Sequence, residues 1–155
     1  MISYQINNGI NGVPKIPGDK SISHRSIIIP SISNGICEIS NILKSDDVRK
    51  TLEAFKNMGV KILENENKIT IFGKGLHSLK EPKKIIYLGN SGTSARLLTG
   101  LLASQKFNSI IEGDDSLSKR PMKRISEPLN LMNAKISTTN GTLPLTINGN
   151  NLNPI

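Results

Sequence analysis

Two short segments of this chain place glycine, hydroxyl and charged residues at the start of apolar helical patterns. The first is Pro-Gly-Asp-Lys-Ser-Ile-Ser-His-Arg over residues 17–25, and the second is Leu-Gly-Asn-Ser-Gly-Thr-Ser-Ala-Arg over residues 88–96. In each, a glycine-containing turn leads into a helix whose predicted first turn carries an arginine, Arg25 or Arg96. A helix N-terminus offers unpaired N–H groups and the positive end of the helix dipole, which favour an anion. The two segments therefore predict one substrate with several negative charges, or two anionic substrates.

A repeated order of elements must position these segments. The first series contains a helix that begins at Ser45 with an acidic first turn and ends at Gly59. Its predicted elements lie at residues 26–33, 35–42, 45–59, 61–64 and 68–72. After a linker over residues 73–82, the second series lies at residues 85–88, 93–104, 108–112, 119–132, 135–138 and 145–147. Pro121 suits the first turn of its helix, whereas Pro128 is expected to kink or divide that helix.

Matching residues in the two series keep a nearly constant spacing. Gly18 precedes Gly89 by 71 residues, and residues 58–62 match residues 132–136 at a spacing of 74. We therefore predict an α/β (α+β) fold with a repeated β-α-β-α-β-β unit. The two units cover about residues 17–73 and 84–149. A unit of this kind buries its apolar surfaces fully only against other units. The alternative is an accidental similarity between two ordinary α/β segments.

Composition limits the class of protein. The chain has 155 residues, of which 36% are hydrophobic and 21% are charged, as expected for one soluble globular domain. It contains no apolar run of membrane-spanning length and no signal pattern after Met1, so we expect a cytoplasmic protein without membrane association. The net charge of +8 could attract nucleic acid, but only 3% of residues are aromatic, and the basic residues form no single tract, so we expect no nucleic-acid partner.

Together with a third segment, Asp-Ser-Leu-Ser-Lys-Arg-Pro-Met over residues 115–122, the two segments resemble the 5-enolpyruvylshikimate-3-phosphate (EPSP) synthase family. This family is also called 3-phosphoshikimate 1-carboxyvinyltransferase. The resemblance implies two domains of three β-α-β-α-β-β units each, with the active site in the cleft between them. Residues 17–155 would then form an incomplete first domain with two of the six units, and residues 1–16 would supply a strand of the second domain. The third unit, with its Ser-Ser-Gln motif, and the rest of the second domain would lie outside this chain.

The resemblance also implies a reaction. The family transfers the enolpyruvyl group of phosphoenolpyruvate to the 5-hydroxyl of shikimate 3-phosphate and releases phosphate, without a metal or an organic cofactor. Both substrates are small molecules with a phosphate and a carboxylate, so fixed cations and helix N-termini must hold mutually repelling anions together. We expect little or no activity from this chain by itself, because one wall of the cleft and the acid/base residues would be missing.

For shikimate 3-phosphate, the resemblance assigns binding to Lys20, Ser21 and Arg25. Lys20 would also contact phosphoenolpyruvate and the reaction intermediate, which makes it the candidate catalytic residue.

For phosphoenolpyruvate, the resemblance assigns a loop of Asn90, Gly92 and Thr93, together with a clamp by Arg120. Gly92 would leave room for a close approach to the backbone. Arg96 is expected to brace this loop rather than to touch substrate.

Several residues have a simpler interpretation beside the chemical one. His24 could transfer protons near neutral pH, but a packing or hydrogen-bonding role at the helix start is the stronger expectation. Cys37 is expected to be an inert buried thiol, and His77 has no metal-ligand pattern around it.

Two other functions stay open at the level of sequence. One is a fragment similar to UDP-N-acetylglucosamine enolpyruvyl transferase, although that family usually has a reactive cysteine where this chain has Asp115. The other is a module that binds anions or nucleic acid without catalysis, which would show steep salt dependence.

Overall fold

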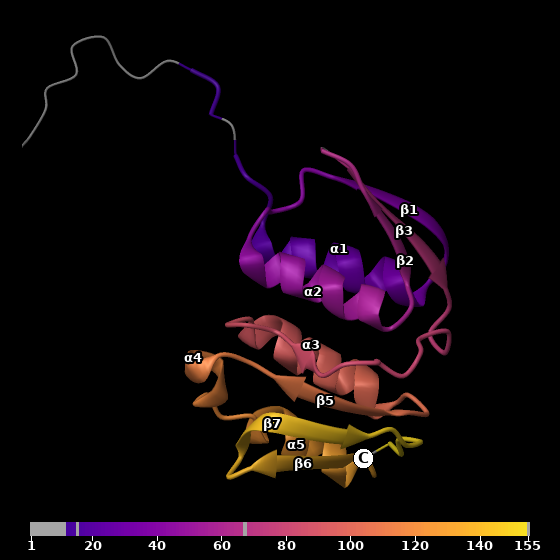
Figure 1. Cartoon of the computed structure of the whole chain (residues 1–155), viewed down its shortest axis with the longest axis vertical. Helices are drawn as coiled ribbons and strands as arrows, with labels where there is room; N and C mark the ends of the chain where they lie inside the picture. The colour runs from indigo at the N-terminus through magenta and orange to yellow at the C-terminus, as the bar shows by residue number, and fades with distance from the viewer. Residues whose placement is uncertain (1–11, 15, 67, 155) are drawn as a thin grey trace, which may run out of the picture.

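The protein folds into two sheets with helices packed between and beside them. The structure is a computed structural model that describes residues 12–14, 16–66 and 68–154. The elements in chain order are α1 (Lys20–Ile32), β1 (Asn34–Ser40), α2 (Asp46–Asn57), β2 (Lys61–Glu64), β3 (Lys68–Lys74), β4 (Ile86–Tyr87), α3 (Gly92–Ala103), β5 (Asn108–Glu112), α4 (Asp115–Ser118), α5 (Lys123–Leu131), β6 (Lys135–Thr139) and β7 (Thr142–Asn148) (Figure 1).

The two sheets share one topology, which confirms the predicted repeat. The first sheet has the antiparallel order β1-β3-β2, and the second has the order β4-β5-β7-β6, in which β5, β7 and β6 are antiparallel. Strands β5, β7 and β6 thus repeat the arrangement of β1, β3 and β2, while β4 adds a parallel strand beside β5. The helix order repeats as well, because α1 and α3 precede β1 and β5, and α2 and α5 follow them.

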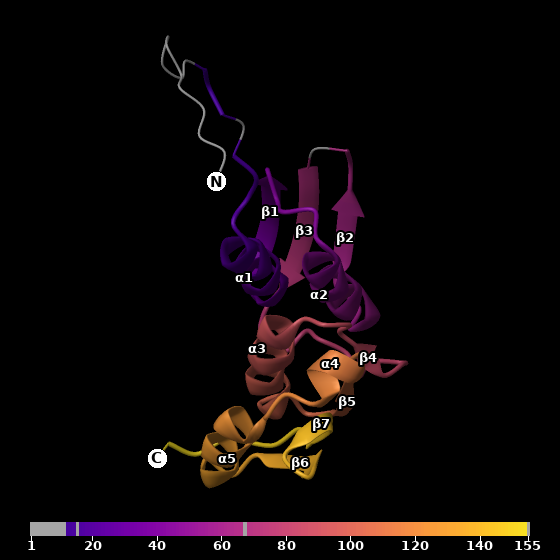
Figure 2. The ribbon, with the colours of Figure 1, turned by 90° about the vertical axis from the view of Figure 1, so that its left-hand side faces the viewer.

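The helices cover one face of each sheet. Helices α1 and α2 pack against the first sheet, and α3 and α5 pack against the second. Helix α3 lies between α1 and α2 on one side and the second sheet on the other (Figures 1 and 2). Alternate residues of the strands face these helices and are buried, among them Ile69 and Ile71 in β3 and Leu145 and Ile147 in β7. The core of both units is therefore continuous through α3.

A close backbone contact occurs at equivalent places in the two units. A Cβ atom on Gly73, in β3, would lie 2.1 Å from the carbonyl oxygen of Pro30 and 2.3 Å from that of Ser33, at the end of α1. A Cβ atom on Gly149, just after β7, would lie 2.1 Å from the carbonyl oxygen of Gln105, just after α3. Only glycine fits where two backbones approach so closely. In both units a glycine therefore lets the last strand pack against the end of the unit's first helix.

The N-terminal helix begins earlier than the sequence predicted. The apolar pattern predicted a helix over residues 26–33, but α1 begins at Lys20, because the side chain of Asp19 caps it by accepting from the Ile22 N–H at 2.7 Å. Arg25 consequently lies in the second turn of α1 rather than in the first.

The predicted helix over residues 119–132 is also wrong in its boundaries. The chain forms the short α4 and then α5, and residues 119–122 between them are not helical. The Met122 N–H donates to the carbonyl oxygen of Gly141 at 2.8 Å, and Pro121 has no N–H, so the backbone bonds to the β6–β7 turn instead. Pro128 does not divide the helix, since it lies inside α5.

The first strand predicted by the resemblance falls mostly outside the described residues, which exclude residues 1–11 and residue 15. Residues 12–14 and 16–19 form neither helix nor strand.

Cys37 is half-buried, whereas the sequence had predicted a buried thiol. Among the described residues, none of the helices combines the length and apolar character needed to cross a membrane.

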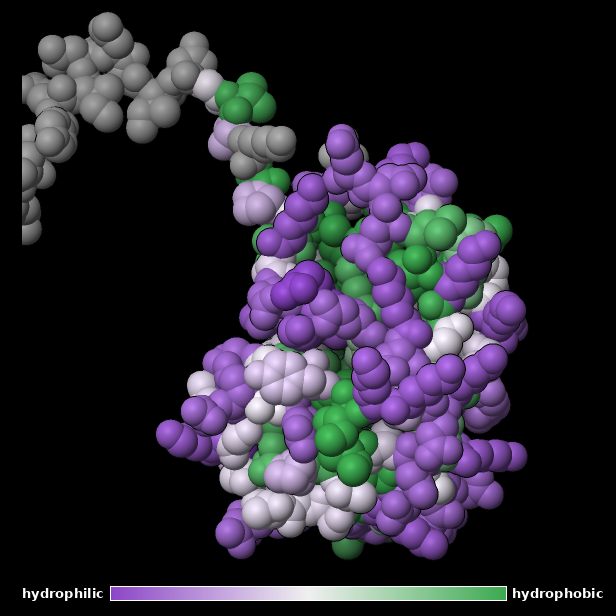
Figure 3. All heavy atoms as spheres, in the orientation of Figure 1, coloured by the Kyte–Doolittle hydropathy of each residue, from purple (hydrophilic) through white to green (hydrophobic). Residues whose placement is uncertain are grey.

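The surface is mostly polar in the view of Figure 3, with apolar side chains among the charged ones. On the outer face of the first sheet, Ile36 is 69% exposed and Leu63 is 48% exposed. Lys61 on the same face lies over the Phe72 ring, with Nζ 4.6 Å from the ring centroid. The helix-covered faces carry the buried apolar residues, and the outer faces carry most of the polar ones.

Candidate active site

The first predicted segment forms the tightly packed start of α1. A Cβ atom on Gly18 would lie 2.2 Å from the carbonyl oxygen of Asn41 and 2.9 Å from the backbone nitrogen of Leu43, so only glycine fits there. Asp19 follows and caps α1 with its carboxylate. The sequence predicted that free backbone N–H groups at the N-terminus of α1 would bind an anion. The negatively charged Asp19 carboxylate already occupies this position, so the backbone there is not open to another anion. The cations at this end of α1 that are exposed to solvent are the side chains of Lys20 and Arg25.

The second segment forms the start of α3 in a similar way. Gly89 has a φ of 55°, which favours glycine, and Ser91 caps α3 by accepting from the Ser94 N–H at 3.3 Å. Ser91 is neutral and fully buried. The start of α3 therefore keeps its positive helix-dipole end without a capping carboxylate.

Helices α1, α2 and α3 begin at the same end of the molecule, which faces the viewer in Figure 2. Lys20, the first residue of α1, forms an ion pair with Asp47 in the first turn of α2. Gly89, before α3, lies against Asp46 of α2, because a Cβ atom there would be 3.6 Å from an Asp46 carboxylate oxygen. The two predicted segments thus meet at one edge, with the start of α2 between them.

The ion pair of Lys20 is a contact that an anionic ligand can replace. The Lys20 side chain is 50% exposed and the Asp47 side chain 18%, and ion pairs between side chains at the surface contribute only about 0–1 kcal/mol. Asp46 and Asp47 lie in the first turn of α2, as their predicted helix-dipole role requires. The sequence did not indicate that Asp47 would also neutralise Lys20.

A second charged group lies around the start of α3. The Arg120 guanidinium donates through Nη2 to Asn90 Oδ1, and Asn90 Nδ2 donates to Asp114 Oδ2 at 3.1 Å. The Asp114 carboxylate also accepts from the Leu117 N–H at 2.8 Å and caps α4. This backbone hydrogen bond, together with those from Asn90 and Ser116 and the charge of Arg120, lowers the pKa of Asp114 below its ordinary value of 3.8. Asp114 therefore orients the Asn90 amide so that its oxygen faces Arg120.

Gly92 lies beneath two guanidinium groups. A Cβ atom there would be 2.9 Å from Arg96 Nη1 and 3.0 Å from Arg120 Nη1. Arg96 donates to the carbonyl oxygens of Gly92, at 3.2 Å, and of Pro121, at 3.5 Å. It thus braces the α3 turn against the segment after α4, as expected from the sequence. The ends of these two arginine side chains fill the space that a side chain at residue 92 would occupy.

His24 is fully buried and joins the two segments. Its Nδ1 atom lies 2.9 Å from Thr51 Oγ1 in α2 and 3.3 Å from Ser94 Oγ in α3, within hydrogen-bond distance of both hydroxyls. Burial lowers the pKa of His24 below its ordinary value of 6.5, the Lys20 charge lowers it further, and Asp47 opposes the shift. The hydrogen-bonding role expected from the sequence is confirmed, and a neutral, enclosed imidazole is poorly placed to exchange protons with a substrate.

The remaining predicted residues lie on the exposed surface beside these groups. Ser21 and Arg25 are exposed on α1, and Thr93 is exposed in the first turn of α3. The structure thus gathers Asn90, Gly92 and Arg120 in direct contact, whereas Lys20 pairs with an acid of α2.

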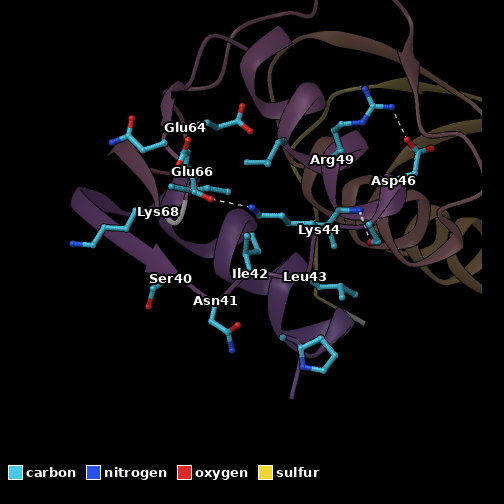
Figure 4. Close-up of a pocket in the computed structure, with 17 residues that line it drawn as sticks. Ser40, Asn41, Ile42, Leu43, Lys44, Asp46, Arg49, Glu64, Glu66 and Lys68 are labelled. Carbon is cyan, nitrogen blue, oxygen red and sulfur yellow. Dashed lines mark hydrogen bonds and ion pairs between the residues drawn. The ribbon is translucent and has the colours of Figure 1, made fainter. Parts of the chain in front are cut away.

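A pocket of about 1100 Å³ opens beside the first segment (Figure 4). It is lined by residues 40–46, by the first turns of α2, and by the turn between β2 and β3, across which Lys44 Nζ donates to the Glu66 carbonyl oxygen at 2.9 Å. Of the first segment only Pro17 and Gly18 line it, and none of the predicted substrate-binding residues does so among those described. The pocket therefore neighbours the candidate site without containing it.

Comparisons with known proteins agree with these observations. The family model of EPSP synthase (3-phosphoshikimate 1-carboxyvinyltransferase) matches residues 4–155. The 3-phosphoshikimate 1-carboxyvinyltransferase of Ruthia magnifica is 54% identical over 142 residues, which are 92% of this chain and 33% of that protein. The enzyme of the same name from Oceanobacillus iheyensis is 51% identical over 97% of this chain and 35% of its own length.

A solved structure of EPSP synthase from Acinetobacter baumannii is similar in fold. It has a TM-score of 0.86 and 50% sequence identity, and the match covers 89% of this chain and 32% of that chain. The chain thus spans about a third of the length of the relatives it matches. The family match, the shared fold and the motifs agree, and the chain belongs to the EPSP synthase family.

Proposed function

We propose that this chain supplies one wall of an active site that transfers the enolpyruvyl group of phosphoenolpyruvate to the 5-hydroxyl of shikimate 3-phosphate. Family membership supports this reaction, and the relatives carry the name of the enzyme. The observation that carries the proposal is the meeting of the two predicted segments at one edge, where three helices begin. That edge combines exposed cations with the dipole end of α3, which suits substrates that each carry a phosphate and a carboxylate.

On the first segment, Lys20, Ser21 and Arg25 would hold shikimate 3-phosphate. These three residues lie in the first two turns of α1 and are exposed to solvent, so a phosphate can reach their side chains without any change in the core. Lys20 would exchange Asp47 for the substrate and then contact phosphoenolpyruvate as well. An ammonium between two anions lowers their mutual repulsion, and this effect persists in the negatively charged intermediate.

On the second segment, Asn90, Gly92, Thr93 and Arg120 would hold phosphoenolpyruvate. Arg120 is positioned by Asn90, which Asp114 holds in turn, so the guanidinium faces the site before substrate binds. A guanidinium can form two parallel hydrogen bonds to a carboxylate or a phosphate. Preorganised donors of this kind lower the cost of bringing the two anions together.

The helices also carry exposed apolar residues on this part of the protein. Ile22 and Ile29, seven residues apart on α1, are 59% and 55% exposed, and Leu97 on α3 is 43% exposed. Apolar residues at helical spacing usually face another element. They support the proposal that residues 17–155 form two thirds of a domain that is completed by a third unit. The other wall of the cleft and the acid/base residues would belong to the part of the relatives that this chain does not span.

The reaction is tested with a chimaera in which this chain replaces the matching third of the Ruthia magnifica relative. We expect the chimaera to release phosphate from phosphoenolpyruvate with shikimate 3-phosphate as acceptor, and the 155-residue chain alone to show no turnover. In the chimaera, Arg120→Ala should lower the rate, whereas Lys119→Ala removes a neighbouring exposed cation and serves as the control.

Two results would contradict the proposal. One is a folded chimaera that is inactive with shikimate 3-phosphate, or that accepts UDP-N-acetylglucosamine instead. The other is an equal effect of the Arg120 and Lys119 substitutions. The cytoplasmic location expected from the sequence stays a prediction.

A further inference from the structure

Four buried polar side chains connect the beginnings of three helices. They are His24 of α1, Thr51 of α2, Ser94 of α3 and Ser91, the cap of α3, and each of them is fully buried. Thr51 Oγ1 lies 2.7 Å from Ser94 Oγ, which lies 2.6 Å from Ser91 Oγ, and His24 Nδ1 contacts the first two hydroxyls. These residues come from both units of the repeat, so the cluster is a polar joint between the units.

Each member of this joint lies next to a residue of the proposed site. On α1, His24 is one turn after Lys20 and directly before Arg25. On α2, Thr51 is one turn after Asp47, the partner of Lys20, and its hydroxyl donates to the Asp47 carbonyl oxygen at 3.3 Å.

At the start of α3, Ser91 lies between Asn90 and Gly92 in the chain. The joint therefore has one end beneath the shikimate 3-phosphate residues of α1 and the other inside the phosphoenolpyruvate loop. Because all its members are buried, they cannot themselves contact a substrate in the cleft.

We propose that His24 is a positioning residue, which fixes the α1 turn that carries Lys20 and Arg25 against the α3 turn that carries Asn90 and Gly92. This inference rests on the proposed function for the identity of the ligand. Buried hydroxyls that bond to one another across three helices hold those helices in one relative position, because separating them leaves unpaired polar groups in the core. Nδ1 is the only side-chain atom of α1 with a hydrogen bond to both hydroxyls, among the interactions of the described residues.

The imidazole must be neutral for this role. Its Nε2 atom is buried and has no hydrogen-bond partner within the described part of the chain. A second proton would place a charged N–H donor at this atom with nothing to accept from it, which is costly. Lys20 in the preceding turn adds a positive charge nearby, and Asp47 is the acid that offsets it.

The test variants either keep or remove a hydrogen bond of the joint. In asparagine, a polar amide atom lies as many bonds from Cβ as Nδ1 does in histidine, so His24→Asn can keep the contact with Thr51. His24→Leu removes it. Thr51→Val removes one hydroxyl of the joint without changing side-chain shape and serves as a second variant if His24→Leu does not fold. Thr99→Val is the matched control, since Thr99 is equally buried on α3 but donates only to Ala95 of its own helix, at 2.7 Å.

The experiment compares amide NMR spectra of the 155-residue chain and its variants, first without ligand and then with added shikimate 3-phosphate. We expect His24→Leu and Thr51→Val to shift the resonances of Asn90, Ser91 and Gly92 in the unliganded protein. We also expect both to weaken shikimate 3-phosphate binding by about tenfold, as loss of a buried hydrogen bond would. His24→Asn should restore both properties, and Thr99→Val should leave both unchanged.

The imidazole resonances of the wild type provide an independent check. In an NMR pH titration, the His24 imidazole should show a pKa below its ordinary value of 6.5.

Several outcomes would overturn the inference. They are unchanged Asn90, Ser91 and Gly92 resonances in both His24→Leu and Thr51→Val, a failure of His24→Asn to differ from His24→Leu, or an equal effect of Thr99→Val. If the wild-type chain does not bind shikimate 3-phosphate, the proposed function is contradicted for this chain, and the unliganded spectra still decide the role of His24.

Discussion

The clearest energetic prediction concerns Gly18, which seats the first segment on the loop between β1 and α2. A Cβ atom there would lie 2.2 Å from the Asn41 carbonyl oxygen, about 1.2 Å short of an ordinary contact of 3.4 Å, and 2.9 Å from the Leu43 nitrogen. Both obstacles are backbone atoms, which cannot rotate away. We therefore expect Gly18→Ala to lower the free energy of unfolding by about 2–3 kcal/mol, near the upper end for overpacking. In a chain of this size, such a loss lowers the melting temperature by about 5–10 °C.

Gly100 provides a matched control with the opposite sign. It lies inside α3, and a Cβ atom there would have no heavy atom within 4 Å, so Gly100→Ala should stabilise the helix by about 0.5–1 kcal/mol. Urea unfolding followed by circular dichroism, with thermal melts on the same samples, measures both changes. A Gly18→Ala protein that is as stable as the wild type would refute the close packing of this segment, as would a Gly100→Ala protein destabilised by a similar amount.

Three further predictions concern pH and helix caps. Because the pKa of His24 in the folded protein lies below 6.5, the unfolded chain binds more protons than the folded chain as the pH falls below 6.5. The free energy of unfolding should therefore fall by up to about 1.4 kcal/mol per pH unit. His24→Asn should remove this part of the pH dependence, which urea titrations at several pH values measure. The pKa of Asp114 in the folded protein lies below 3.8, so the ionised carboxylate stabilises the fold fully above pH 3.8, and this stabilisation is lost as the pH falls through the folded pKa. The difference in unfolding free energy between the wild type and Asp114→Ala should therefore narrow on acidification. A difference that stays constant with pH would contradict this. Ser45→Ala removes the cap of α2 and should lower the free energy of unfolding by about 1 kcal/mol. Ser91→Ala should lower it by more, because Ser91 is fully buried and also contacts Ser94. Coinciding denaturation curves of the two variants would refute the buried joint.

Local signals in the sequence predicted the elements that depend on local interactions. The acidic first turn after Ser45 and the glycine at Gly59 bracket α2, and the strands predicted at residues 61–64 and 108–112 have the same bounds as β2 and β5. The 71-residue spacing predicted the repeat because the two units share one topology. The start of α1 was missed because the predicted helix began with the apolar pattern at residue 26, whereas the Asp19 cap lies about two turns ahead of it.

Apart from the start of α1, the features that the sequence did not predict depend on contacts between residues distant in the chain. The break after α4 is set by the hydrogen bond from the Met122 N–H to Gly141, which comes from a turn 19 residues further along the chain. The pairing of Lys20 with Asp47 joins residues 27 positions apart. In the same way, the motifs named the candidate residues of the site, but only the packing of three helices shows that buried hydroxyls connect the two segments.

If the two segments form one half of a site for shikimate 3-phosphate and phosphoenolpyruvate, the first segment should bind shikimate 3-phosphate, which calorimetric titration of the 155-residue chain measures. We expect saturable binding of shikimate 3-phosphate, weakened about tenfold or more by Lys20→Met, which removes a charge-assisted contact. Lys135→Met removes an equal charge from the exposed surface of β6 and should leave the affinity unchanged. Equal losses of affinity for the two variants, or no saturable binding by the folded wild type, would show that Lys20 and the first segment do not form a shikimate 3-phosphate site.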